Sequence, residues 1–186
     1  MDSVAFTVPG KPRGKQRHAT NRFTGRNFTP KQTVAKEREI AQLYRLAARG
    51  VPLMTGTVRL KVEAVFAVPK SWATVMREAA LEQMLTYTGK PDADNILKLV
   101  MDALNGVAWV DDSQVHPEKP IRRYGEPERV EVWLEHVQAA DGLKSPAERR
   151  REKKVASGMV TPKSSKRRAK RNLSASKLLA IGRRIR

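Results

Sequence analysis

The 186-residue sequence has no cysteine, which excludes disulfide bonds, thiolate zinc sites and cysteine nucleophiles and suits a reducing compartment. It has no apolar run of about 18 residues, so no membrane-spanning helix is expected. Its first residues lack the basic stretch and apolar core of a secretory signal, and we expect a cytoplasmic protein. Acidic residues are scarce: 19 Asp and Glu accompany 37 Lys and Arg, a net charge of +18. This excess favours a polyanionic partner, nucleic acid before an anionic membrane.

The positive charge lies at the two ends of the chain. Residues 1–31 carry seven Lys or Arg and one Asp, a net charge of +6, and residues 137–186 have a net charge of +13. Residues 32–136 carry 14 basic and 15 acidic residues, a net charge of −1. A near-neutral body with a basic arm and a basic tail is typical of nucleic-acid binding. A tail that only improves solubility is the alternative.

Hydrophobic periodicity predicts a mixture of strands and helices. Alternating apolar residues predict strands at 4–8, 57–68 and 129–135, and a short strand at 107–110. Helical spacing predicts helices at 33–49, with Thr33 as N-cap, at 72–84 and at 95–105. Residues 10–31 are rich in Gly, Pro, Lys and Arg and predict a loop or basic hairpin.

These elements predict an α+β fold, a small mixed β-sheet packed by helices, in one domain at residues 1–137. Residues 138–186 would form a basic C-terminal tail. Because residues 144–172 contain few large apolar groups, we expect them to be disordered without a partner. Residues 174–185 could form a transient basic helix.

The segment from Lys90 to Val115 carries the candidate chemistry. On the helix at 95–105, a polar stripe that begins at Asp94 runs along one side, with apolar residues opposite. If residues 92–94 are extended, Asp92 and Asp94 project to the same side at the helix start. Two adjacent carboxylates repel each other unless a cation compensates, and Mg²⁺ prefers such oxygen ligands.

A second acidic element, Asp111-Asp112, follows the short strand predicted at 107–110. That strand could return one of the two carboxylates to the helix start. Together with Asp92, Asp94 and Lys98, it would suit metal-assisted phosphodiester hydrolysis, in which Lys98 donates to the phosphate or the leaving oxygen.

Structural interpretations of these residues stay open. Asp94 could be only an N-cap, Asp102 only a solvated residue, and Asp111-Asp112 only a turn. Spacing alone does not name the reaction.

Three short motifs resemble the RusA family of Holliday junction resolvases. They are Pro91-Asp92-Ala93-Asp94-Asn95 with Lys98, Asp102-Ala103-Leu104-Asn105-Gly106, and Asp111-Asp112-Ser113-Gln114-Val115. The opening is similar too, in Gly10-Lys11-Pro12-Arg13, Lys15-Gln16-Arg17 and Phe28-Thr29-Pro30. The resemblance covers about residues 4–136. Gly14 and His18 depart from it, since many members have proline there.

The resemblance implies a homodimeric, Mg²⁺-dependent endodeoxyribonuclease of bacterial cells, often encoded by phages or prophages, that cuts four-way DNA junctions in recombination and repair. Asp92 and Asp94 would be metal ligands, Asp112 the third essential carboxylate and Asp111 its support. Lys98 would contact the scissile phosphate or help to activate water. Mn²⁺ is an alternative metal. The residues that would bind DNA are Lys11, Arg13, Lys15, Arg17 and Lys119.

Other function classes remain alternatives. A non-catalytic nucleic-acid-binding or packaging protein would use the same carboxylates structurally. A nuclease could prefer other branched DNA, such as flaps or forks. An adaptor protein would use the basic tail to recruit partners.

Deletion of residues 138–186 should leave DNA cleavage intact while weakening non-specific DNA binding. The tail's cations would no longer release counterions from DNA, so the salt dependence of binding should become shallower. Binding isotherms over a range of salt concentrations measure this slope. An unchanged slope would show that the tail does not touch DNA.

Overall fold

The computed structural model describes residues 3–17, 19–20, 22–137 and 144–160. Its centre is a five-stranded sheet in the order β1-β7-β4-β5, with β6 also paired to β4. The strands are β1 (Ser3–Pro9), β4 (Thr57–Phe66), β5 (Val115–Pro117), β6 (Ile121–Tyr124) and β7 (Arg129–Val137). β7 is antiparallel to β1 and β4, whereas β5 and β6 pair parallel to β4. This mixed sheet and its helices confirm the predicted α+β class.

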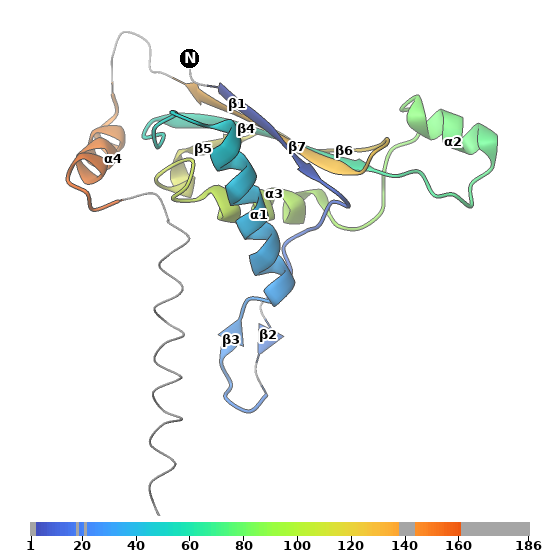
Figure 1. Cartoon of the computed structure of the whole chain (residues 1–186), viewed down its shortest axis with the longest axis horizontal. Coiled ribbons are helices and arrows are strands. Elements are labelled where there is room, and N and C mark those ends of the chain that lie inside the picture. The colour runs from blue at the N-terminus through green and yellow to red at the C-terminus, as the bar shows by residue number, and fades with distance from the viewer. Residues whose placement is uncertain (1–2, 18, 21, 138–143, 161–186) are drawn as a thin grey trace, which may run out of the picture.

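Two helices, α1 (Lys31–Ala47) and α3 (Ala93–Leu104), lie together against one face of the sheet (Figure 1). Alternate residues of β1, β4 and β7 point into this layer, because side chains alternate between the faces of a strand. The opposite face is more polar. There Lys61 Nζ lies 4.9 Å from the ring centroid of Trp133. The core is therefore one-sided, between the sheet and the two helices.

Helix α3 is fixed by its apolar side. The sequence spacing that predicts an amphipathic helix is confirmed, since Asp94, Lys98, Asp102 and Asn105 all stay outside the core. Burial of each large apolar side chain stabilises this packing by about 1.5–3 kcal/mol. The position of α3 therefore determines where its polar residues lie. Its buried residues are Ile96, Leu99, Val100, Ala103 and Leu104.

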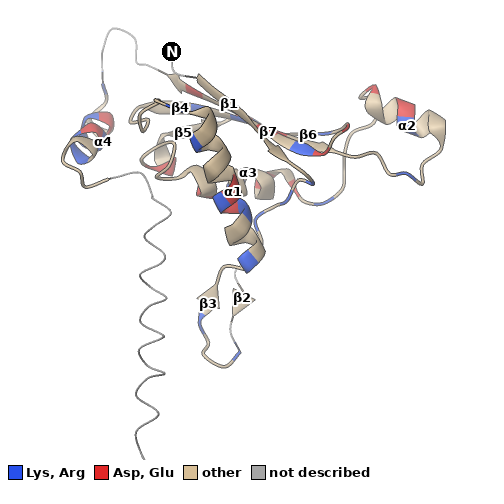
Figure 2. Ribbon diagram, viewed as in Figure 1, with Lys and Arg blue, Asp and Glu red and all other residues tan. Residues whose placement is uncertain are grey.

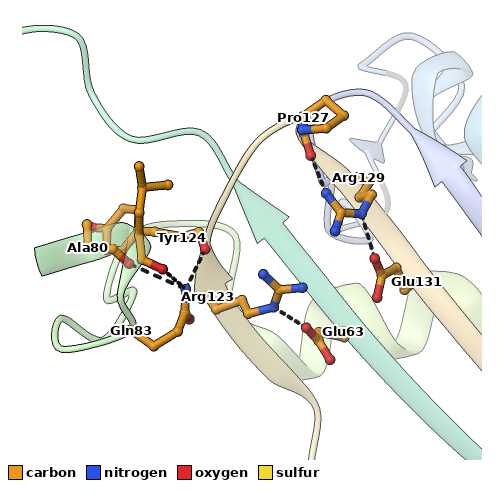
Figure 3. Close-up of polar contacts among 9 residues, drawn as sticks. Glu63, Ala80, Gln83, Arg123, Tyr124, Pro127, Arg129 and Glu131 are labelled. Carbon is orange, nitrogen blue, oxygen red and sulfur yellow. Dashed lines mark hydrogen bonds and ion pairs between the residues drawn. The ribbon is translucent and has the colours of Figure 1, made fainter. Parts of the chain in front are cut away.

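The far end of the sheet carries α2 (Thr74–Leu81), which projects away from the core (Figure 1). Gln83 Nε2 donates to the carbonyl of Tyr124 at 2.9 Å and so ties the end of α2 to β6 (Figure 3). Nearby, Arg123 pairs with Glu63 and Arg129 with Glu131. These ion pairs offset arginine charge within the sheet, in keeping with the near-neutral body.

Most predicted elements are confirmed, with shifted ends. The strands at 4–8, 57–68 and 129–135 are β1, β4 and β7, and the three predicted helices are α1, α2 and α3. Residues 10–31 include the two-stranded hairpin of β2 (Ala19–Thr20) and β3 (Asn27–Phe28).

Thr33 is not the N-cap of α1. Pro30 holds that position in an extended conformation, and the helix begins at Lys31. Thr33 is buried and its hydroxyl lies 3.4 Å from Gln16 Oε1. It therefore contacts the basic loop at residues 10–17 instead.

The predicted strand at 107–110 is wrong. Gly106 adopts a positive φ of 68°, which suits glycine, and its N–H donates to the carbonyl of Trp109 at 2.8 Å. The chain therefore turns tightly against the end of α3, where Trp109 is fully buried. The carboxyl pair that follows stays at this end of the helix.

The prediction of disorder over residues 144–172 is also wrong in part, because α4 (Pro146–Ala156) is helical. Ser145 Oγ caps it by accepting from Glu148 N, proline opens it, and Lys153 and Lys154 occupy its last turn. These local signals favour a helix that buries no residue. The predictions for residues 161–172 and 174–185 lie outside the described residues. None of the described helices is long and apolar enough to cross a membrane.

Candidate functional site

Two carboxylates stand at the start of α3. Asp92 is the N-cap residue, with an extended backbone, and Asp94 lies in the first helical turn. The extended conformation predicted for residues 92–94 therefore holds for Asp92 but not for Asp94. Asp92 makes no capping hydrogen bond within the described part of the chain. Both carboxylates face solvent at the end of the helix that favours negative charge.

Lys98 lies one turn after Asp94, and its Nζ is 3.1 Å from Asp94 Oδ2. Hydrogen bonding from Lys98, with its positive charge, lowers the pKa of the Asp94 carboxyl below its ordinary value. Asp94 is thus ionised at neutral pH. Both side chains are more than half exposed, so the pair is open to a phosphate or a cation from solvent.

The chain that leads into α3 is held by two polar side chains. Tyr87 donates its hydroxyl hydrogen to the carbonyl of Lys90 at 2.8 Å. Arg122 on β6 donates to the carbonyls of Gly89, at 2.8 Å, and Pro91, at 3.4 Å. These contacts link the carboxylate pair to the sheet edge.

The basic loop lies directly over the start of α3. Lys15 N donates to the carbonyl of Asn95 at 2.8 Å, and the Lys15 ammonium pairs with Asp102 farther along α3. A Cβ at Gly14 would lie only 2.9 Å from the Cβ of Pro91 and 3.0 Å from that of Asn95. Glycine at this position therefore allows the loop to approach the helix closely.

A groove of about 700 Å³ lies between this loop, the N-terminal part of α1 and the start of α3. Lys and Arg residues mark the loop and α1 on this side of the molecule (Figure 2). Asp92 is the acidic residue of its lining. The groove therefore places a cationic wall beside a carboxylate. Its basic residues are Lys11, Arg13, Lys15, Arg17, Lys36 and Lys90.

Asp111 caps the short 3-10 helix η1 (Asp112–Gln114), as the turn interpretation predicts. Its Oδ1 accepts from Ser113 N at 2.9 Å, while Gln114 Oε1 accepts from Asp111 N at 3.1 Å. Hydrogen bonds from Ser113, with the nearby charges of Arg151 and Lys154, lower the pKa of Asp111. Buried Gln114 also donates to the carbonyls of Met54 and Gly56. The turn is therefore anchored to the core.

Asp112 is held by two donors at the C-terminal end of α3. Asn105 Nδ2 donates to its Oδ2 at 2.9 Å, and Trp109 Nε1 donates to its Oδ1 at 2.8 Å. Each oxygen keeps capacity for a further contact, because a carboxylate has about four lone-pair sites. The carboxylate is thus oriented and still able to bind a ligand.

The two acidic groups stand at opposite ends of α3. Twelve helical residues rise about 18 Å at about 1.5 Å each, so Asp112 lies far from Asp92 and Asp94 within one chain. In the described ranges, no three His, Asp or Glu side chains come together to hold a metal ion. One chain therefore unites Asp92, Asp94 and Lys98 but leaves Asp111 and Asp112 apart.

The predicted DNA-binding residues fall in two places. Lys11, Arg13, Lys15 and Arg17 line the groove, although Lys15 is occupied by Asp102. Lys119 is exposed between β5 and β6 and does not line the groove. Their contacts with DNA stay predictions.

Similarity to known proteins identifies the family of this chain. The family model described as Endodeoxyribonuclease RusA matches residues 9–135. The chain belongs to the RusA family of endodeoxyribonucleases. It is also 35% identical over 144 residues to the Bacillus subtilis (strain 168) protein described as Uncharacterized protein YqaN, which covers 75% of this chain and 100% of that protein. The family resemblance seen in the sequence is thereby confirmed, and the activity is that of a nuclease, a hydrolase.

Some supporting residues were not singled out from the sequence. Asn105 and Gln114 stood inside the recognised motifs without an assigned role. Trp109, which fixes Asp112, had only been included in the strand predicted at 107–110. Arg122 lies on a strand that is distant in the sequence, and no local pattern predicts its contact with Pro91.

The hydrogen bond from Asn105 to Asp112 can be tested by a double-mutant cycle with Asn105→Ala and Asp112→Asn. A hydrogen bond to a charged group contributes about 1.5–3 kcal/mol, so the two changes should be coupled by about 1–2 kcal/mol in the free energy of unfolding. Urea denaturation measures it. Strictly additive effects would show that Asn105 does not hold Asp112.

Proposed function

We propose that this RusA-family chain is a Mg²⁺-dependent endonuclease that resolves four-way DNA junctions by paired phosphodiester cleavage. The observation that carries the proposal is the carboxylate pair Asp92–Asp94 beside a groove lined by six basic residues. A purely binding surface gains nothing from exposed carboxylates next to phosphates. The geometry therefore favours a nuclease over the non-catalytic alternative.

The donor set suits Mg²⁺, with Mn²⁺ the alternative. Mg²⁺ is usually held by one or two carboxylates, waters and substrate phosphate oxygens, and Asp92 and Asp94 supply the carboxylates. When bound, the ion would lower the pKa of water and neutralise charge on the scissile phosphate. Asp112 would be a further ligand, with Asp111 as its support.

The basic residues have separate tasks in this proposal. Those of the groove hold the DNA backbone, which contributes affinity and orientation without sequence information. Lys98 is the cation next to Asp94. It would turn from Asp94 to the scissile phosphate and stabilise the charge that develops there.

The separation of the carboxylates supports a homodimer. A two-fold axis that pairs two α3 helices antiparallel would bring the start of one helix to the end of the other. Asp92 and Asp94 of one chain would then share a metal with Asp112 of the partner subunit. Two such sites related by two-fold symmetry suit a junction that needs two matched cuts.

Asp94→Asn should reduce cleavage of a labelled four-way junction in Mg²⁺ by at least about 100-fold. Loss of a residue that hydrogen-bonds a metal ligand lowers activity by about 10–100-fold, and loss of a ligand itself should lower it more. Junction binding should survive or strengthen, since a negative charge near phosphate is removed. Glu126→Gln, which alters an exposed carboxylate in the turn before β7, is the matched control and should cut normally.

Two gel results would overturn the proposal. Full cleavage by Asp94→Asn would exclude the metal role. Unpaired cuts, or a preference for flaps or forks over the junction, would instead indicate a nuclease for other branched DNA.

A further inference from the structure

Helix α4 has two distinct faces. Its half-buried residues are spaced at about 100° per residue so that all four lie on one side, and its exposed cations lie on the other. The inward residues are Glu148, Arg151, Glu152 and Val155, and the outward cations are Arg149, Arg150, Lys153 and Lys154. The solvent face is therefore uniformly positive.

The inward face of α4 contacts the body of the protein, and the helix lies on the β5 side of the molecule (Figure 1). Arg151 Nη2 donates to Ser113 Oγ at 2.9 Å, in the same turn that carries Asp111 and Asp112. A Cβ at Gly56 would lie 2.6 Å from Glu148 Oε1 and 2.7 Å from His136 Nε2, so the helix also approaches the start of β4. These contacts place α4 beside the double-Asp turn.

The acidic residues of α4 do not offset its outer charge. Glu148 lies near Gly56 at the start of β4, and Glu152 pairs with Lys144. Like charges one turn apart on a helix destabilise it by a few tenths of a kcal/mol per pair. The outer face contains two such pairs four residues apart, Arg149 with Lys153 and Arg150 with Lys154. Since α4 buries no residue, core packing does not explain this arrangement.

We propose that the outer face of α4 binds the phosphate backbone of DNA next to the double-Asp turn. Figure 2 shows basic residues on both α4 and α1. The proposal rests on the proposed function for its substrate, DNA. It adds a contact from outside the family match, which ends at residue 135. Phosphate contact needs only positioned cations, so α4 would extend the DNA footprint without adding sequence preference.

The test uses the full chain without divalent metal, so that DNA is bound but not cut. Arg149, Arg150, Lys153 and Lys154 are all changed to Gln, which keeps a good helix former at each position. The slope of log K against log salt should become shallower by about 3–4, because each phosphate contact on duplex DNA contributes about 0.9. The change should be equal on a linear duplex and a four-way junction.

A matched pair of variants guards against general charge effects and misfolding. Arg149→Gln with Arg150→Gln should reduce the slope by about 2. Arg49→Gln with Lys70→Gln removes two exposed cations outside α4 and should leave the slope nearly unchanged. Circular dichroism checks that α4 is still helical.

The outcomes separate this inference from the proposed function. An unchanged slope in the α4 variants, or an equal loss in the control pair, would overturn the role of α4 even if the unaltered protein resolves junctions in Mg²⁺. A shallower slope confined to the α4 variants would support it. If that result came with no junction cleavage by the unaltered protein, the proposed function alone would fail.

Discussion

A twelve-residue helix that is buried on one side sets the distance between the two acidic groups of this protein. The apolar side of α3 is held against the sheet, so neither end can move far without exposing core residues. Asp92 and Asp94 stand at its start, whereas Asn105 and Trp109 hold Asp112 at its end. The carboxylates that resemble one metal site in the sequence are thus kept apart within a chain, and a shared site between two chains follows as the proposal.

The charges around the groove complement the carboxylates at the start of α3. The helix start favours negative charge, the loop over it is basic, and the hydrogen bond from Lys98 lowers the pKa of Asp94. Lys15 links the loop to α3 through Asp102 and the carbonyl of Asn95. The net charge of +18 therefore conceals a near-neutral body in which a few carboxylates stand among positioned cations.

The amphipathic side of α3 and the alternation in β1, β4 and β7 could be predicted, because each is a local pattern repeated over several residues. The turn after Gly106 could not, since burial of Trp109 outweighed the strand tendency of residues 107–110. The start of α4 has local helix signals at Ser145, Pro146 and Glu148. Its low apolar content nevertheless led to a prediction of disorder. The candidate site residues were found from motifs, but the distance between Asp94 and Asp112 depends on tertiary packing that no local motif encodes.

Mixing two inactive chains tests the shared site most directly. Asp94→Asn and Asp112→Asn chains are co-expressed with different tags, and the mixed dimer is purified and given a labelled four-way junction in Mg²⁺. A shared site predicts that one of the two sites regains all its carboxylates, so nicking recovers to about half of the unaltered dimer's rate. A mixed dimer as inactive as either parent would contradict the account, because each site would then draw its carboxylates from a single chain.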